Sequence, residues 1–200
     1  YMILPPYVIK IIDILSSHSR EAFAVGGCVR DLLMEKPPTD YDVATSALPQ
    51  EIMALFPKTV PTGVKHGTVT VFMDGVPVEI STFKGRDNGQ GGLHEDLQRR
   101  DFTINAIAID AKGVIHDPFG GREDLEKKII RSPLNQSRER FAEDPLRMIR
   151  AIRLAVSFGF TLHPTVTESI LDSHELIRQV SIERIREELN KILVSDSPAL

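Results

Sequence analysis

The stretch GGCVRDLLMEKPPTDYDVAT, residues 26–45, constrains the fold more than any other part of the chain. Two glycines follow a short apolar run and precede residues typical of a helix start. This order predicts a strand, a tight glycine turn and a helix. The backbone N–H groups of such a turn, together with the helix dipole, favour an anion, so the turn is predicted to bind a phosphate.

Asp40 and Asp42 lie in the same stretch, in a segment predicted to be a strand. Side chains two residues apart on a strand face the same side, so both carboxylates are expected to point the same way. Two such carboxylates repel each other unless a cation lies between them, and hard oxygen ligands favour Mg²⁺. A phosphate-binding turn beside a pair of carboxylates that binds Mg²⁺ predicts phosphoryl or nucleotidyl transfer, although either feature alone is more often structural.

Residues 63–83 form alternating β segments joined by a predicted hairpin turn at Asp74–Gly75. Glu79 lies in the returning strand and is a candidate third carboxylate; the alternative is an ordinary solvated strand glutamate. Residues 84–92, KGRDNGQGG, contain no apolar residue and are interpreted as a mobile loop. The segment RRDFTINAIAID, residues 99–110, joins two arginines to an apolar run that should be buried. This favours arginines held in a specific position over an ordinary solvated patch.

Composition limits the class of protein. The chain has 200 residues, 42% hydrophobic content and a net charge of −4, which argues against nucleic-acid binding through bulk positive charge. No apolar run reaches the length of a membrane span, and we expect no signal peptide and no membrane partner. Cys28 is the single cysteine, so we predict no disulfide and a reducing, cytoplasmic location. The oligomeric state is left open.

From about residue 137 the sequence changes to helical periodicity. We predict helices at Glu139–Phe158, Pro164–Ser173 and Ile182–Leu193, and we place domains at 1–136 and 137–200. Arg147, Arg150 and Arg153 form an i, i+3 ridge on the first of these helices; an ordinary solvated basic face is the alternative.

Asp144 and Arg147 suggest a way to read a base. A carboxylate accepts hydrogen bonds and a guanidinium only donates them. The pair matches the donor–acceptor edges of cytosine and adenine, and it mismatches those of guanine and uracil. It would therefore accept CTP and ATP without a template.

The ordered segments GGCVRD, DYDVAT, RRDFTINA, DPFGG, ERFAEDPLRMIRAIRLA and SIERIREELNK resemble the motifs of class II tRNA nucleotidyltransferases, the CCA-adding enzymes, and of bacterial poly(A) polymerases. This resemblance implies an α+β fold: a polymerase β-like nucleotidyltransferase head with a mixed sheet and flanking helices, then an all-helical neck. It also implies body and tail domains that do not fit in 200 residues, so we expect an N-terminal portion of a longer protein.

The resemblance also implies roles for individual residues. The catalytic and metal positions would be Asp40 and Asp42, with Glu79 as a third active-site carboxylate and Mg²⁺ as the cofactor. The 117–121 segment matches a hinge motif, and 183–188 matches a motif that supports the neck. The nucleotide-binding positions would be Gly27, Arg30, Arg100, Asp144, Arg147, Arg150 and Arg153.

The implied reaction is Mg²⁺-dependent transfer of nucleotides from CTP and ATP to the 3′ end of tRNA. Two alternatives within the family stay open: an enzyme that adds only the two cytidines, suggested by the short glycine-rich 84–92 segment, and a poly(A) polymerase. A nucleotide-binding module without catalysis is disfavoured by the paired aspartates. An antibiotic nucleotidyltransferase is disfavoured because it does not explain the Asp144–Arg147 helix.

Overall fold

A computed structural model describes residues 4–85 and 91–195 of the chain. These residues form two compact units. The first unit contains the residues up to 99 together with 105–118, and the second contains 100–104 together with the residues from 119 onward. The chain therefore enters the second unit briefly, returns to the first, and leaves it again after Pro118.

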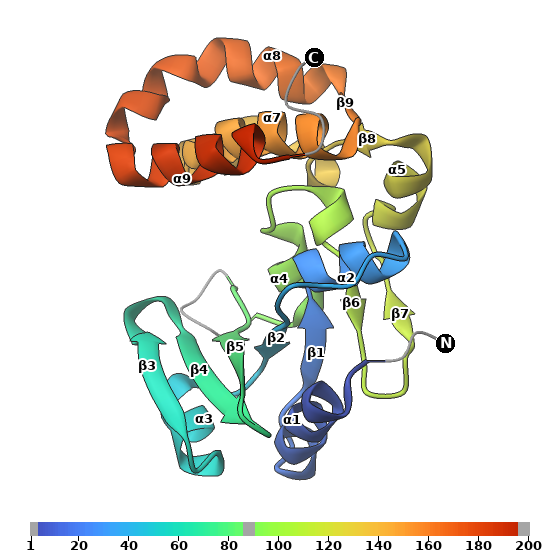
Figure 1. Ribbon diagram of the computed structural model, residues 1–200, viewed down its shortest axis with the longest axis vertical. Helices are drawn as coiled ribbons and strands as arrows, with labels where there is room; N and C mark the ends of the chain where they lie inside the picture. The colour runs from blue at the N-terminus through green and yellow to red at the C-terminus, as the bar shows by residue number, and fades with distance from the viewer. Residues whose placement is uncertain (1–3, 86–90, 196–200) are drawn as a thin grey trace. The chain divides into compact units, whose positions relative to one another are not determined.

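The first unit is built on a seven-stranded sheet in the described part of the chain, with the order β3-β4-β5-β2-β1-β6-β7 (Figure 1). The β2–β5 pair is parallel and the other neighbours are antiparallel, so the sheet is mixed. The bounds are β1 (Ala22–Val25), β2 (Asp42–Thr45), β3 (Thr59–Gly63), β4 (Thr68–Met73), β5 (Val76–Thr82), β6 (Ala108–Ile109) and β7 (Ile115–His116).

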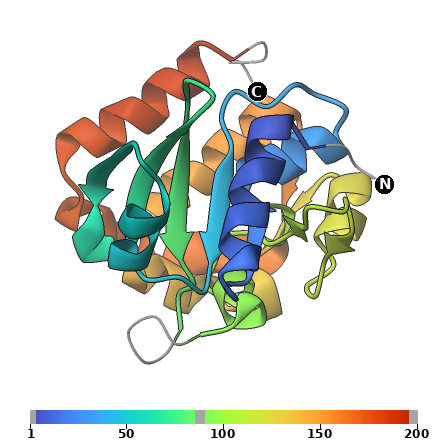
Figure 2. The same ribbon diagram turned by 90° about the horizontal axis from the view of Figure 1, so that it is seen from below.

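Helices α1 (Pro6–Ser17) and α3 (Pro49–Leu55) pack on one face of this sheet (Figure 2). Each begins with a proline in its first turn, where the missing N–H would have no helical partner. Helix α1 is amphipathic, and its apolar side chains at helical spacing are buried. Helix α2 (Gly27–Leu33) follows β1, and α4 is formed by Leu93–Gln98. Residues 86–90, which make up most of the predicted 84–92 loop, lie outside the described residues.

The second unit is mainly helical. Its helices are α5 (Gly121–Lys127), α6 (Ser137–Glu143), α7 (Leu146–Phe158), α8 (Pro164–Ser173) and α9 (Ile182–Leu193), with 3₁₀ turns at η3 (Pro133–Asn135) and η4 (His174–Gln179). The predicted single helix from 139 to 158 is wrong, because the chain breaks between α6 and α7. Asp144 takes an extended conformation with φ −147°, as residues before proline prefer, and Pro145 is the N-cap of the next helix, which begins at Leu146.

A two-stranded parallel sheet joins β8 (Ile129–Ile130) to β9 (Thr161–Leu162) within this unit. The expectation of an all-helical 137–200 region is therefore wrong at β9. Gly159 ends α7 in the left-handed conformation at φ 65°, which releases the chain to extend. Backbone bonds from Thr161 N to Lys128 O and from His163 N to Ile130 O, each 2.9 Å, then fix it beside β8.

The predicted α+β class, with a mixed sheet flanked by helices, is confirmed. The domain boundary at 136/137 stays a prediction. None of the described helices is both long and apolar enough to cross a membrane.

Candidate nucleotide site

The glycine turn after β1 forms as the sequence predicts. Gly26 has φ 81°, a left-handed conformation that a side chain would strain, and it precedes the first residue of α2. A Cβ placed on Gly27 would lie 3.5 Å from Nη2 of Arg30, an ordinary contact distance, which shows that the guanidinium lies close to the turn. The turn and the arginine therefore form one local structure.

Arg30 is held by two oxygen acceptors. Its Nε and Nη2 donate to Oδ1 of Asp31 at 2.9 and 2.7 Å, and its Nη1 donates to Oδ1 of Asn105 at 2.9 Å. Only 11% of the Arg30 side chain is exposed. Neither Asp31 nor Asn105 is among the site residues predicted from the sequence; the adjacent Arg-Asp pair in GGCVRD is the local signal that points to Asp31.

The carboxylates lie at the start of β2 and on β5. Asp42 is the first residue of β2 and pairs in register with Glu79 across the parallel β2–β5 ladder. Register neighbours on adjacent strands point to the same face, so these two side chains share one side of the sheet. The prediction that Asp40 also lies on the strand is wrong: Asp40 is exposed in a bend before β2. Two prolines, at 37 and 38, precede this bend, and β2 begins only at Asp42.

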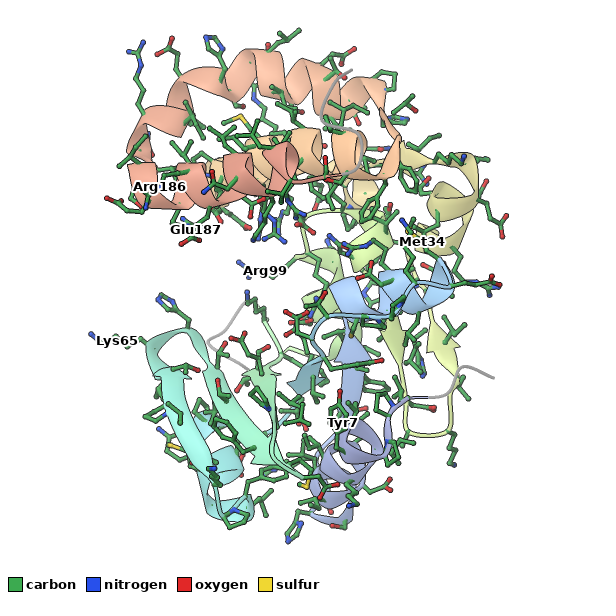
Figure 3. The ribbon with its side chains drawn as sticks, in the orientation of Figure 1. Tyr7, Met34, Lys65, Arg99, Arg186 and Glu187 are labelled. Carbon is green, nitrogen blue, oxygen red and sulfur yellow. The ribbon has the colours of Figure 1, made fainter. Side chains whose placement is uncertain are left out.

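Tyr41, between the two aspartates, is buried at 8% exposure. Its ring meets that of Tyr7 on α1 edge to face, with centroids 6.0 Å apart (Tyr7 is labelled in Figure 3). Burial raises the pKa of Tyr41, with smaller contributions from Tyr7 and Cys28, so the phenol stays neutral at physiological pH. This inward anchor fixes the backbone that carries Asp40 and Asp42.

The motif TGVKHGTV forms the turn between β3 and β4. Val64–His66 is a 3₁₀ turn (η1) that ends at Gly67, with φ 79°. Gly67 O accepts from Thr82 N at 2.9 Å, which ties the turn to β5. Lys65 and His66 are exposed, and Figure 3 shows Lys65 projecting from this turn. The structure gives His66 no identifiable chemical role.

In the second unit, the segment that carries Arg100 is held by its neighbours. Arg100 is half-buried, and the next residue, Asp101, forms a 3.2 Å ion pair with Arg150 of α7. Thr103 donates from its hydroxyl to Asp124 and from its backbone N to Arg131 O at 2.7 Å. Arg100 and Asp101 of the RRD motif therefore lie in the same unit as the basic ridge of α7, and Asp101 links the two segments.

Asp144 and Arg147 lie at the junction of α6 and α7. Oδ1 of Asp144 accepts from the Leu146 amide at 3.3 Å, and Oδ2 accepts from Arg184 of α9 at 2.9 Å. Nη1 of Arg147 donates to Arg140 O and to Oε2 of Glu143, each at 3.2 Å. These contacts fix the carboxylate and the plane of the guanidinium, and both side chains keep part of their surface exposed, 28% and 16%.

Arg153, the last arginine of the ridge, pairs with a buried glutamate. Its Nε lies 2.6 Å from Oε2 of Glu188 on α9, and Lys191 lies 3.5 Å from the other oxygen. Glu188 belongs to the 183–188 segment that the family resemblance associates with support of the neck. The geometry around Arg153 is thus that of a helix-to-helix link, and its predicted contact with nucleotide stays a prediction.

Among residues 4–85 and 91–195, no three histidine, cysteine or carboxylate side chains are grouped around a common metal position. Mg²⁺ in phosphoryl-transfer sites usually takes only one or two protein carboxylates, with water and substrate phosphates as the other ligands. The donor chemistry of Asp40, Asp42 and Glu79, all hard oxygens, fits that mode of binding.

Comparison with known proteins decides the family. Residues 22–131, more than half of the 200, match the family model described as the poly A polymerase head domain. The chain belongs to this family. A second model, described as the probable RNA and SrmB-binding site of polymerase A, matches residues 159–200. The family resemblance predicted from the motifs is confirmed.

Relatives in this poly A polymerase head family include CCA-adding enzymes. That of Geobacillus stearothermophilus is 45% identical over 94% of this chain and 50% of its own length. That of Lactobacillus johnsonii is 48% identical over 86% of this chain and 46% of its own length. The chain thus spans about half the length of these curated relatives.

Two solved structures of CCA-adding enzymes share the fold. The Bacillus stearothermophilus enzyme in complex with CTP superimposes with a TM-score of 0.92 at 45% identity, over 96% of this chain and 50% of that one. The Thermotoga maritima enzyme complexed with tRNA-CCA gives a TM-score of 0.82 at 30% identity, over 98% and 49%.

Proposed function

We propose that this chain is the catalytic and nucleotide-selecting part of a tRNA nucleotidyltransferase that adds C and A to the tRNA 3′ end without a template. The observation that carries this proposal is the in-register pairing of Asp42 with Glu79 in a domain that matches the poly A polymerase head family. The Gly27–Arg30 turn follows strand β1 of the same sheet. Structures of similar CCA-adding enzymes in complex with CTP and with tRNA support this proposal.

Asp40 and Asp42 would hold the divalent metal, which we propose to be Mg²⁺, with Glu79 beside them. When bound, the metal would lower the pKa of the attacking 3′-hydroxyl and stabilise negative charge on the α-phosphate. The protein's own contribution is to keep the carboxylates in place: the β2–β5 register aligns Asp42 with Glu79, and the buried Tyr41 anchors the segment between the aspartates. Pyrophosphate would leave as the phosphodiester forms.

Gly27, Arg30 and Arg100 would bind the triphosphate. The guanidinium of Arg30 suits this task because its planar array of donors matches phosphate oxygens. Asp144 would accept from the exocyclic amino group of cytosine or adenine, and Arg147 would donate to the adjacent ring nitrogen. Arg150 and Arg153 would contribute from the same helix. Guanine and uracil would leave these groups unpaired, which is costly in a desolvated site.

The macromolecular substrate would be the 3′ end of tRNA, and the protein would act in the cytoplasm. Because the chain is acidic overall, at −4, we expect tRNA to be recognised by local surfaces rather than by bulk charge. One assay tests the proposal: the full-length protein is incubated with Mg²⁺, labelled CTP or ATP, and tRNA lacking its 3′ CCA. Incorporation of C and then A, and no incorporation of U or G, is the expected result. No incorporation of any nucleotide would contradict the proposal.

A second candidate, addition of the two cytidines only, is favoured by the sequence of residues 84–92. This segment has four glycines and no apolar residue, so holding it in a second ordered position would be entropically costly. The same pocket must bind cytosine first and adenine later. A segment that reshapes the pocket between these additions would have to hold a second ordered position. Because residues 86–90 lie outside the described structure, this hypothesis rests on sequence alone.

A further inference from the structure

Asn105 is a buried polar residue that the proposed mechanism has not used. It is 5% exposed and lies just before β6. Because β6 pairs with β1 through Val25 and Ala108, the chain entering β6 lies beside the glycine turn that ends β1. This is why a residue far along the chain reaches the first turn of α2. Its side-chain oxygen accepts from Nη1 of Arg30 at 2.9 Å.

We propose that Asn105 is a positioning residue for the triphosphate: together with Asp31 it fixes the plane of the Arg30 guanidinium beside Gly27. The inference rests on the proposed function of Arg30. Asp31 engages the Nε and Nη2 edge, and Asn105 engages Nη1, so the two acceptors hold different parts of the same planar group. A guanidinium held in this way does not have to be ordered when a phosphate arrives.

The choice of an amide is part of the argument. Arginine only donates hydrogen bonds, so the amide oxygen of Asn105 must face it. A carboxylate at 105 would accept equally well, but with Asp31 it would place two negative charges on one guanidinium. The pair of carboxylates would then repel an incoming polyphosphate. A neutral acceptor orients Arg30 without adding a second negative charge beside Asp31.

The test uses the full-length protein and measures equilibrium affinity for two probes, CTP and cytidine, which share a base but differ in phosphates. Asn105→Leu removes the acceptor at similar volume. We expect it to weaken CTP binding at least about tenfold, the lower end of what one hydrogen bond to a charged group contributes, and to leave cytidine affinity unchanged. Asn190→Leu, on the exposed side of α9, is the matched control and should change neither affinity.

A double-mutant cycle distinguishes positioning from packing. In an Arg30→Met background, Asn105→Leu should produce no further loss of CTP affinity, because the group it positions is gone. Asn105→Asp provides a second variant that keeps the acceptor: we expect unchanged thermal stability and weaker CTP binding. Additive losses in the cycle, equal losses for CTP and cytidine, or an Asn105→Asp variant with normal CTP affinity would overturn the inference. A wild-type protein that binds CTP no better than cytidine would contradict the proposed function, and this role with it.

Discussion

Replacing Asp144 with asparagine separates the two roles that the structure allows for this carboxylate. One oxygen accepts from the Leu146 amide at 3.3 Å at the start of α7, and the other accepts from Arg184 at 2.9 Å. Asparagine keeps an oxygen for the helix start and offers an amino group in place of the second oxygen. If this side chain reads the base edge, a donor now stands where an acceptor stood.

The structure sets the size of each effect. Arg184 and Asp144 are 51% and 28% exposed, so their ion pair contributes at most about 1 kcal/mol, which corresponds to a fall in Tm of roughly 2–4 °C. A mismatched base contact should cost about 1–3 kcal/mol for cytosine and adenine. Uracil and guanine, which present a carbonyl, should gain. The ratio of kcat/KM for CTP to that for UTP is therefore expected to fall about 5- to 150-fold.

The assay is single-nucleotide incorporation into tRNA lacking its 3′ end, with each of the four nucleotides in turn. Arg184→Ala is the matched control because it removes the ion pair and leaves the carboxylate in place. It should lower the melting temperature slightly and keep the preference for CTP. A direct role of Asp144 in reading the base is refuted if Asp144→Asn slows all four nucleotides equally, or if Arg184→Ala relaxes selectivity as much as Asp144→Asn does.

Three further predictions follow from other parts of the molecule. Asp42→Ala should abolish incorporation and leave the melting temperature unchanged or higher, since it relieves repulsion with Glu79 in the metal-free protein; activity above a few per cent of wild type would exclude the metal role. Arg153→Met should destabilise the protein by about 2 kcal/mol in chemical denaturation, because Glu188 loses its 2.6 Å partner and keeps the more distant, exposed Lys191, and adding Glu188→Leu should restore most of the loss; an additive double variant would argue against a coupled pair. With tRNA ending in C-C and ATP, the 84–92 hypothesis expects much slower addition than CTP addition to unprimed tRNA, and equal rates would reject it.

Local signals in the sequence were sufficient for several elements. Helices α8 and α9 begin and end at the predicted residues. Pro164 sits in the first turn of α8, and α9 repeats its apolar residues at helical spacing, so each boundary is encoded in neighbouring residues. The glycine turn was predictable for the same reason, because Gly26 needs a conformation that other residues avoid.

Features that depend on distant residues were missed. The strand β9 exists because its backbone pairs with β8, and nothing in its own two residues indicates this partner. Asn105 lies 75 residues after Arg30 in the sequence, and the β1–β6 register brings the two side chains together. Asp40 illustrates the converse. Its spacing of two residues from Asp42 predicted a position on the same strand, but Asp40 lies in a bend before that strand begins. The roles of the predicted site residues stay predictions, because their chemistry requires a bound substrate to be observed.

The brief passage of residues 100–104 through the second unit has a consequence for synthesis on the ribosome. Phe102 and Ile104 are completely buried in the finished protein, and Thr103 between them depends on Asp124 and Arg131. All the residues of the first unit precede these partners in the chain. At about 5–20 residues per second, the nascent chain therefore carries this apolar segment without its partners for a few seconds. A chaperone that binds short apolar segments would find its site here during that interval, and no single cut in the chain could release the first unit intact without the 100–104 segment.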